Sequence, residues 1–205
     1  MRAADDRRDL WSFGNAVLYD LCRNFPNHTR NSQVTAKVWL IGRAYSAAVE
    51  RGVARESAAP RDTTRFYRLR IARPIRLSGI DRHIAKLRTI SRLDVKNAPF
   101  VLAAHARLVD VLAKSIRKRK RSFASKYLHF HAPIAVPIYD SIAAGSLRER
   151  IPNRRRLPRS FRGYDPAYAI FVGRYLQFRD DIVARFGLDL SPRQLDRLLW
   201  KPTDQ

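Results

Sequence analysis

The sequence predicts an all-α protein that folds as one domain over residues 1–205. Apolar residues recur at helical spacing along almost the whole chain, no two alternating runs are joined by a hairpin turn, and capping residues, proline or glycine stand at the ends of the periodic stretches. Apolar residues make up 45% of the chain, which excludes a disordered basic tail as a description of the whole. We expect a single core or two closely packed lobes at this length.

Two helices are predicted in the first quarter of the chain. The first carries apolar residues from Leu10 to Leu21 and stops near Pro26, and the second runs from about Gln33 to Glu50. The stretch from Arg51 to Arg76 is polar and contains two prolines. We expect it to be a loop that forms the boundary between the lobes.

Helical spacing resumes after this loop. Ser78 can cap a helix that carries Ile80 to Ile90, and Pro99 stands where a long apolar helix begins. Ser122 to His131 is predicted to form a short helix that Pro133 closes.

The last third of the chain contains three helix starts with a capping residue. Asp140 precedes a helix predicted from Ser141 to about Arg150. Asp165 and Ser191 are each followed by proline, the residue favoured at the first helical position, so they are predicted to open a long helix and a short one. The loop with the most arginine, Arg148 to Arg162, lies between these starts.

The charge of the chain indicates a polyanionic partner. Lys and Arg number 41 against 18 Asp and Glu, a formal net charge of +23 that exceeds what solubility requires. Nucleic acid is therefore the first partner to expect, before an anionic membrane surface or an acidic protein. Cys22 is the only cysteine, which excludes a disulfide framework or a cysteine-based metal site and fits a reducing cytoplasm. No apolar run approaches a membrane span, so we expect neither export nor insertion.

One segment, from Arg117 to Ser141, combines a run of cations with an apolar helix. Five consecutive cations, Arg117 to Arg121, run directly into the aromatic helix that contains Lys126, and Asp140 follows after an extended connection. A solvated basic surface does not normally continue into an apolar helix. We therefore expect a phosphate-binding surface and a buried pocket side by side.

Lysine and aspartate are the two groups that cleavage of an N-glycosidic bond can use. Departure of the base leaves positive charge on the sugar, which a fixed carboxylate stabilises, and a neutral amine can attack the anomeric carbon to form a Schiff base. Burial and neighbouring cations favour the neutral form of Lys126, and a helix N-terminus favours the ionised form of Asp140. The simpler interpretations are a phosphate contact for Lys126 and a helix cap for Asp140.

The stretch from Lys126 to Asp140, with its Ala-Val-Pro-Ile-Tyr-Asp end, resembles the catalytic segment of the helix-hairpin-helix DNA glycosylases, in the branch with the 8-oxoguanine glycosylase fold. The resemblance covers about 30 residues well. It implies a two-lobed helical fold with the active site between the lobes, Lys126 as the nucleophile and Asp140 as the essential carboxylate. The Schiff-base step of Lys126 stays open against a reaction of Asp140 with water alone, because some relatives work with the aspartate and a water. The chain departs from the family in having no Gly-x-Gly hairpin before Lys126, where Arg117 to Arg121 stand instead. The interval from the lysine to the aspartate is also shorter than in the family.

The other site residues are predicted from their positions around this segment. The helix that contains Trp39 is expected to line the pocket of an extruded base, with a buried Arg–Glu pair as the simpler interpretation. His129 and His131 are two residues apart, so a helix points them to different sides and a joint metal site is not expected. The predicted base-pocket residues are Trp39, Arg43, Tyr45, Glu50, Tyr127, His129, His131 and Tyr139. The predicted DNA contacts are Arg117, Lys118, Arg119, Lys120, Arg121, Ser122, Ser125, Arg154, Arg155 and Arg156.

The sequence thus predicts a monomeric, cytoplasmic and nucleoid-associated DNA glycosylase that needs no cofactor or metal. The excised base stays open between a damaged base such as 8-oxoguanine, in repair, and a bulky modified base of phage DNA, in antiviral defence. The alternative is a non-catalytic protein that binds RNA, ribosomes or DNA, in which Lys126 and Asp140 would lie too far apart to share one sugar. A nuclease is less favoured, because no acidic cluster is suited to magnesium.

Overall fold

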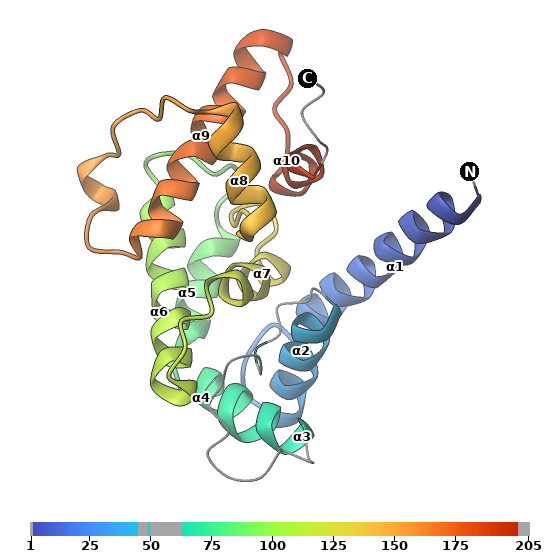
Figure 1. The fold of residues 1–205 in the computed structure, drawn as a ribbon. Coiled ribbons are helices and arrows are strands. Elements are labelled where there is room, and N and C mark those ends of the chain that lie inside the picture. Colours follow the sequence, from blue (N-terminus) through green and yellow to red (C-terminus); the bar gives the residue numbers. More distant parts are fainter. Residues whose placement is uncertain (1, 45–48, 50–62, 201–205) are drawn as a thin grey trace.

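The computed structural model describes residues 2–44, 49 and 63–200, and every element of secondary structure in this part of the chain is helical. The predicted all-α class is therefore confirmed (Figure 1). The elements are α1 (Arg2–Asn24), α2 (Asn31–Ala44), α3 (Thr63–Phe66), the π-helix η1 (Tyr67–Ala72), α4 (Arg73–Arg76), α5 (Ile80–Arg88), α6 (Ala98–Ile116), α7 (Arg121–His131), α8 (Ser141–Arg150), the 3-10 helix η2 (Arg159–Phe161), α9 (Pro166–Phe186) and α10 (Pro192–Leu199).

The short helix α7 lies in the middle of the molecule (Figure 1). It packs against α1, α2, α5 and α6. At one end of the molecule α8 packs against both α9 and α10, and at the other end α2, η1 and α4 pack together. Buried apolar residues from Leu18 in α1 to Leu199 in α10 form one continuous cluster. The helices on both sides of α7 therefore share one core.

The three helix starts predicted from capping residues are confirmed. Asp140 accepts a hydrogen bond from the Ala143 amide at 2.9 Å at the start of α8. Asp165 accepts one from the Tyr168 amide at 3.1 Å at the start of α9. Ser191 forms a capping box with Gln194 at the start of α10. Each contact joins residues three apart in the sequence, so the short-range pattern is sufficient to specify the helix start.

The predicted loop from Arg51 to Arg76 is wrong for its second half. Residues 63–76 are helical, and Tyr67, Ile71 and Ile75 are buried at a spacing of four residues. This buried stripe packs η1 against α2 and α4 against α6, and the two ends of the molecule are linked through that packing. The arginines between the apolar residues made the stretch polar on average and hid its helical period. Residues 51–62 lie outside the described part of the chain.

Candidate active site

Lys126 and Asp140, the two residues predicted to be catalytic, lie next to each other. The Lys126 Nζ is 3.3 Å from the Asp140 Oδ2, and their side chains are only 7% and 14% exposed. Solvent screens such a pair less than it screens a pair at the surface. The ion pair is therefore shielded from most of the solvent, but a small part of each side chain remains accessible.

Hydrogen bonds from α7 and α9 hold the connection that leads to Asp140. Ser125 is fully buried, and its Oγ accepts the Tyr139 amide at 2.9 Å and lies 2.9 Å from the Ser122 carbonyl oxygen, to which it donates. The Tyr168 hydroxyl donates to the Pro137 carbonyl at 3.0 Å. Ser125 was predicted to contact DNA and Tyr139 to line the base pocket. Ser125 is buried and stands directly before Lys126, and its hydrogen bond ties α7 to Tyr139, the half-buried residue directly before Asp140.

The carboxylate of Asp140 has two separate partners. Its backbone is extended, its Oδ1 accepts the Ala143 amide of α8, and its Oδ2 faces Lys126. A carboxylate in this position interacts favourably with the positive end of the helix dipole. The carboxylate therefore caps α8 with one oxygen and directs the other at the lysine.

A third buried ionisable group, Asp196, lies near this pair. Asp196 is on α10, which packs against α8, and it accepts a hydrogen bond from Arg193 at 2.8 Å. Its other oxygen, Oδ1, is buried with no hydrogen-bond partner in the described part of the chain. Burial raises the pKa of Asp196 to about 6, against the opposing charge of Arg193. The charges of Asp140 and Lys126 also act on this carboxyl group, so it lies within electrostatic reach of the pair.

The sequence analysis missed Asp196, although the sequence contains a signal for it. The buried residues of α10 are Pro192, Leu195, Asp196 and Leu199, which occupy one helical face at the i, i+3, i+4 and i+7 positions. An acidic residue inside such an apolar stripe indicates a buried charge.

His129 lies one helical turn after Lys126 and is held as a neutral ring. Its Nδ1 is 2.7 Å from the Val136 carbonyl, which can only accept, so Nδ1 carries the proton. Its Nε2 therefore accepts from the Tyr19 hydroxyl of α1, at 2.7 Å. Burial lowers the pKa of His129 to about 4 and raises that of Tyr19 to about 12. The His129 ring, predicted to line a base pocket, instead links α1 to the connection before α8.

Tyr127 and His131 occupy another side of α7, where they belong to the core. The Tyr127 hydroxyl donates to the Nε2 of His28 at 2.6 Å, and the Nδ1 of His28 donates to Asp81 at 2.5 Å. The ring of His131 lies 5.0 Å from that of Tyr127. Both predicted base-pocket residues are buried among these partners. The structure does not bring them together with Lys126.

The predicted base-pocket residues from the second helix are described in part. Trp39 is 42% exposed, and Arg43 is exposed at the end of α2. Tyr45 and Glu50 lie outside the described residues. Lys37, also on α2, is completely buried, and its charge acts on His131 of α7; the sequence analysis assigned no role to it.

A basic turn, residues 117–120, joins α6 to α7. Arg117 and Lys118 are exposed, and Arg117 has a left-handed backbone with φ 53° and ψ 28°. This conformation costs a residue other than glycine about 1–2 kcal/mol. The turn therefore holds exposed cations at the start of α7, as predicted for DNA contacts, with a strained backbone at its first residue.

Arg119 and Arg121 are directed to a buried carboxylate. The Nε of Arg121 lies 2.8 and 2.9 Å from the two oxygens of Asp165, and Arg119 donates to Asp165 at 3.2 Å. Burial alone would raise the pKa of Asp165, but the Tyr168 amide and the Arg121 guanidinium outweigh it and lower the pKa. These two predicted DNA contacts thus tie the start of α7 to the start of α9. Lys120 and Ser122, the other predicted contacts here, are half-buried.

The structure contains cavities away from Lys126 and Asp140. One of about 420 Å³ is lined by Arg154 and Arg156 of the arginine-rich loop and by the first turns of α9. Another of about 360 Å³ lies between α4 and α6. Neither is lined by Lys126 or Asp140.

The described residues offer neither a metal site nor a membrane span. No group of three or more His, Cys, Asp or Glu side chains in this part of the chain could hold a metal ion. Among the helices of the same residues, none has both the length and the apolar character needed to cross a membrane.

Comparison with known proteins gives no relative from which a function could be transferred. No protein-family model, no curated protein and no solved structure matches the chain. The functional argument therefore depends on the residues themselves.

Proposed function

We propose that this chain is a DNA glycosylase in which Asp140 and Lys126 act on one sugar. The observation that supports this best is the 3.3 Å separation of their side chains at a nearly buried position. In this proposal the helices α1–α4 and α8–α10 are the two lobes, and the reaction site lies where they meet at α7. A basic protein of net charge +23 would bring the anionic strand to that site.

The proposed reaction breaks the bond between C1′ of the sugar and a nitrogen of the base. The base leaves with the bonding electron pair, and the ionised Asp140 stabilises the positive charge that develops on the sugar. The amine of Lys126, once neutral, attacks C1′ and forms a covalent intermediate that becomes a Schiff base when the sugar ring opens. Water then releases the sugar as an abasic site.

Asp196 supplies a place for the proton that Lys126 must lose. A carboxyl group with a pKa of about 6 is mostly ionised at pH 7 and can accept a proton near that pH. Transfer from Lys126 to Asp196 leaves Asp140 ionised for the sugar. We therefore assign Asp196 the role of proton acceptor in the same reaction.

The position of the pair also favours one alternative. Neither of the two cavities described above is lined by Lys126 or Asp140. This is what we expect if the two residues form an ion pair that only stabilises the fold. In that case the chain would be a non-catalytic nucleic-acid-binding protein. The experiment below also tests which base is excised, and so whether the protein acts in repair or in antiviral defence.

The experiment incubates the protein with duplex and single-stranded DNAs that each carry one damaged or modified base, among them 8-oxoguanine and glycosylated phage bases. Alkali then cleaves at abasic sites. We expect cleavage with one class of base, and a loss of at least 100-fold with Asp140→Asn, which keeps the helix cap and removes the charge. Absence of cleavage across the panel, with salt-sensitive binding retained, would support the non-catalytic alternative.

A further inference from the structure

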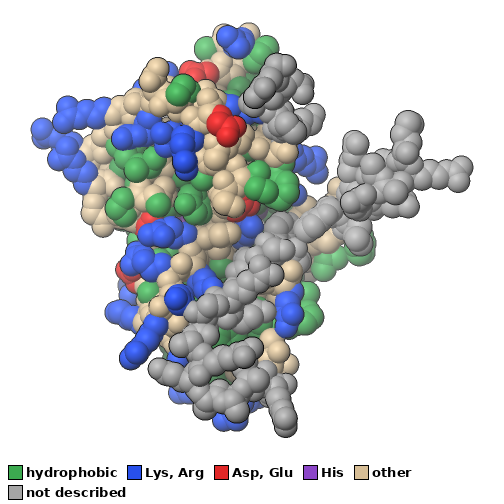
Figure 2. Space-filling view, viewed as in Figure 1, with side chains coloured by type: hydrophobic (Ala, Val, Ile, Leu, Met, Phe, Trp, Pro, Cys, Tyr) green, Lys and Arg blue, Asp and Glu red, His purple; other side chains and the backbone are tan. Residues whose placement is uncertain are grey.

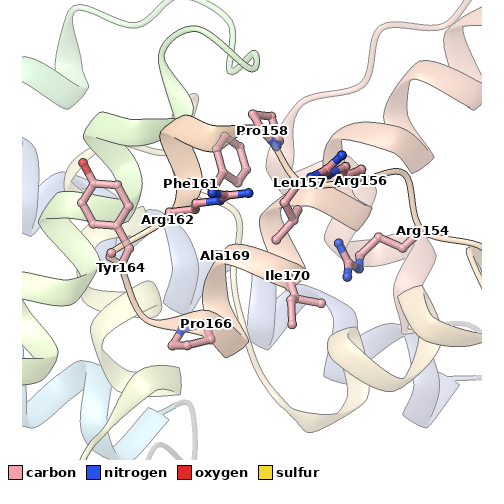
Figure 3. Close-up of a pocket in the computed structure, with 11 residues that line it drawn as sticks. Arg154, Arg156, Leu157, Pro158, Phe161, Arg162, Tyr164, Pro166, Ala169 and Ile170 are labelled. Atoms are coloured by element: carbon pink, nitrogen blue, oxygen red, sulfur yellow. The ribbon is translucent and has the colours of Figure 1, made fainter.

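The loop between α8 and α9 borders an open surface cavity whose lining includes neither Lys126 nor Asp140. The cavity has a volume of about 420 Å³, within the usual range of small-molecule sites. Leu157 and Ile170 lie at its centre, and Arg154 and Arg162 approach it from opposite sides (Figure 3). The ring of Tyr164, also at its border, points away (Figure 3). The cavity thus combines an aliphatic floor with a cationic rim.

The cationic rim lacks compensating acids. In the described part of the chain, the guanidinium groups of Arg156 and Arg162 have no ion-pair or hydrogen-bond partner, and that of Arg154 donates to the Arg155 carbonyl. Burial and the nearby charges of Arg154 and Arg148 lower the pKa of Arg174, behind this rim. Lys and Arg side chains also gather at the edge of the molecule formed by this loop (Figure 2). Such an accumulation is stabilised by an anion.

The loop is held in place by contacts that leave this rim free. The Arg155 amide donates to the Gln177 side chain at 2.9 Å, and the Arg155 guanidinium lies 3.7 Å from both Asp180 and Asp181. Leu157 packs directly on Gly173 of α9, so closely that an added Cβ at position 173 would collide with it. Arg155, predicted to contact DNA together with its neighbours, therefore serves as an anchor of the loop.

We infer that this cavity binds one nucleotide of a DNA strand, with the base on Leu157 and Ile170 and the flanking phosphates on Arg154, Arg156 and Arg162. An aliphatic floor accepts a flat base without reading its hydrogen-bonding edge, and guanidinium groups match phosphate oxygens. The choice of DNA as the source rests on the proposed function. The cavity itself takes no part in the reaction, and it would anchor the strand beside the site.

The test measures binding of a fluorescent single-stranded 12-mer of unmodified bases by anisotropy at several salt concentrations. Arg162→Ala should weaken binding about tenfold, and Ile170→Trp, which fills the cavity without a change of charge, should do the same. Arg185→Ala removes one exposed cation from the far end of the same helix, α9, and should change the affinity less than twofold. Gly173→Ala, which displaces Leu157, should also weaken binding.

Two outcomes would overturn the inference. In the first, Arg162→Ala weakens binding no more than Arg185→Ala and Ile170→Trp has no effect, so only the overall charge matters. In the second, inorganic phosphate competes with the 12-mer as well as deoxyadenosine monophosphate does, so no base enters the cavity. Because the 12-mer contains no substrate base, these results are independent of glycosylase activity. A protein that cleaves no DNA could still bind a nucleotide here.

Discussion

Two lysines, one on α7 and one on α2, are buried in different surroundings. Lys126 keeps 7% of its side chain exposed and lies 3.3 Å from Asp140. Lys37, on α2, is completely buried, and its Nζ has no hydrogen-bond partner in the described part of the chain. Burial lowers the pKa of Lys37, and it is the charges of Cys22 and Asp81 that oppose this shift. The lowered pKa of Lys37 favours its neutral, nucleophilic form.

The difference shows that a perturbed lysine is not by itself a reactive one. The amine of Lys37 faces the core, where His131 has an Nε2 that is also buried without a partner. A substrate cannot reach it unless the core opens. Lys126 is partly accessible to solvent and lies beside the carboxylate that the proposed reaction needs. Access and a suitable neighbour therefore favour Lys126, and the following predictions test that choice.

Covalent trapping on abasic DNA should separate the two lysines most strongly. Borohydride reduces a Schiff base between an amine and the opened sugar, and abasic DNA needs no prior excision. Lys126→Ala should lower the trapped product at least 100-fold, and Lys37→Met should leave it within twofold of the parent protein. Trapping that survives in Lys126→Ala, or that the parent protein never shows, would remove Lys126 from the role of nucleophile.

Acid stability should show that the histidine beside Lys126 is neutral. The pKa of His129 is about 4 in the folded protein, below its unfolded value of about 6.5, so the unfolded chain binds the proton first as the pH falls. Stability from the neutral ring is complete above pH 6.5 and is lost toward pH 4, at about 2 kcal/mol by pH 5.

Urea unfolding at pH 7.5 and pH 5 measures this loss. His129→Gln should reduce the difference between the two pH values by about 2 kcal/mol. His131→Gln applies the same test to the histidine near Lys37. Burial lowers the pKa of His131 as well, so this variant should also reduce the difference between the two pH values. An unchanged difference in His129→Gln would mean that folding does not lower the pKa of this ring.

The pH dependence of excision should report Asp196. If the Asp196 carboxylate accepts the proton of Lys126, the single-turnover rate rises as the pH passes through about 6. Asp196→Asn should lower the rate at pH 7.5 about tenfold and remove that rise. A variant that is slower but keeps the rise would give Asp196 a purely structural role.

The smallest effect expected is on stability. Lys37→Met removes a buried amine without a partner and should raise the free energy of unfolding by about 1 kcal/mol at pH 7. Because the pKa of Lys37 is lowered in the folded state, the parent protein gains stability as the pH rises toward 10.5, and the gap to the variant narrows. Lys126→Met should instead destabilise, since Asp140 loses its partner. Thermal unfolding at pH 7 and pH 9 checks both, and a less stable Lys37→Met would indicate a hidden partner for that amine.

The parts of the site that could be predicted are those close in sequence. Lys126 and Asp140 are 14 residues apart, and the helix, the turn and the cap between them leave few ways to fold the connection. The capping patterns at Asp165 and Ser191 are as local, because each joins an oxygen to an amide three residues on. The buried Ser125, by contrast, accepts the amide of Tyr139, 14 residues on, and the helical pattern gave no indication of this bond.

The sequence by itself therefore determined most of the helices, apart from those of residues 63–76, and the starts of α8, α9 and α10, because these depend on short-range periodicity and hydrogen bonds. Only the tertiary structure decided that Asp196 lies near the pair and that Arg155 anchors its loop while Arg162 is left free. The physical reason is that a charged side chain takes its role from the partners that packing supplies. Those partners come from helices far apart in the chain, and no local pattern specifies them.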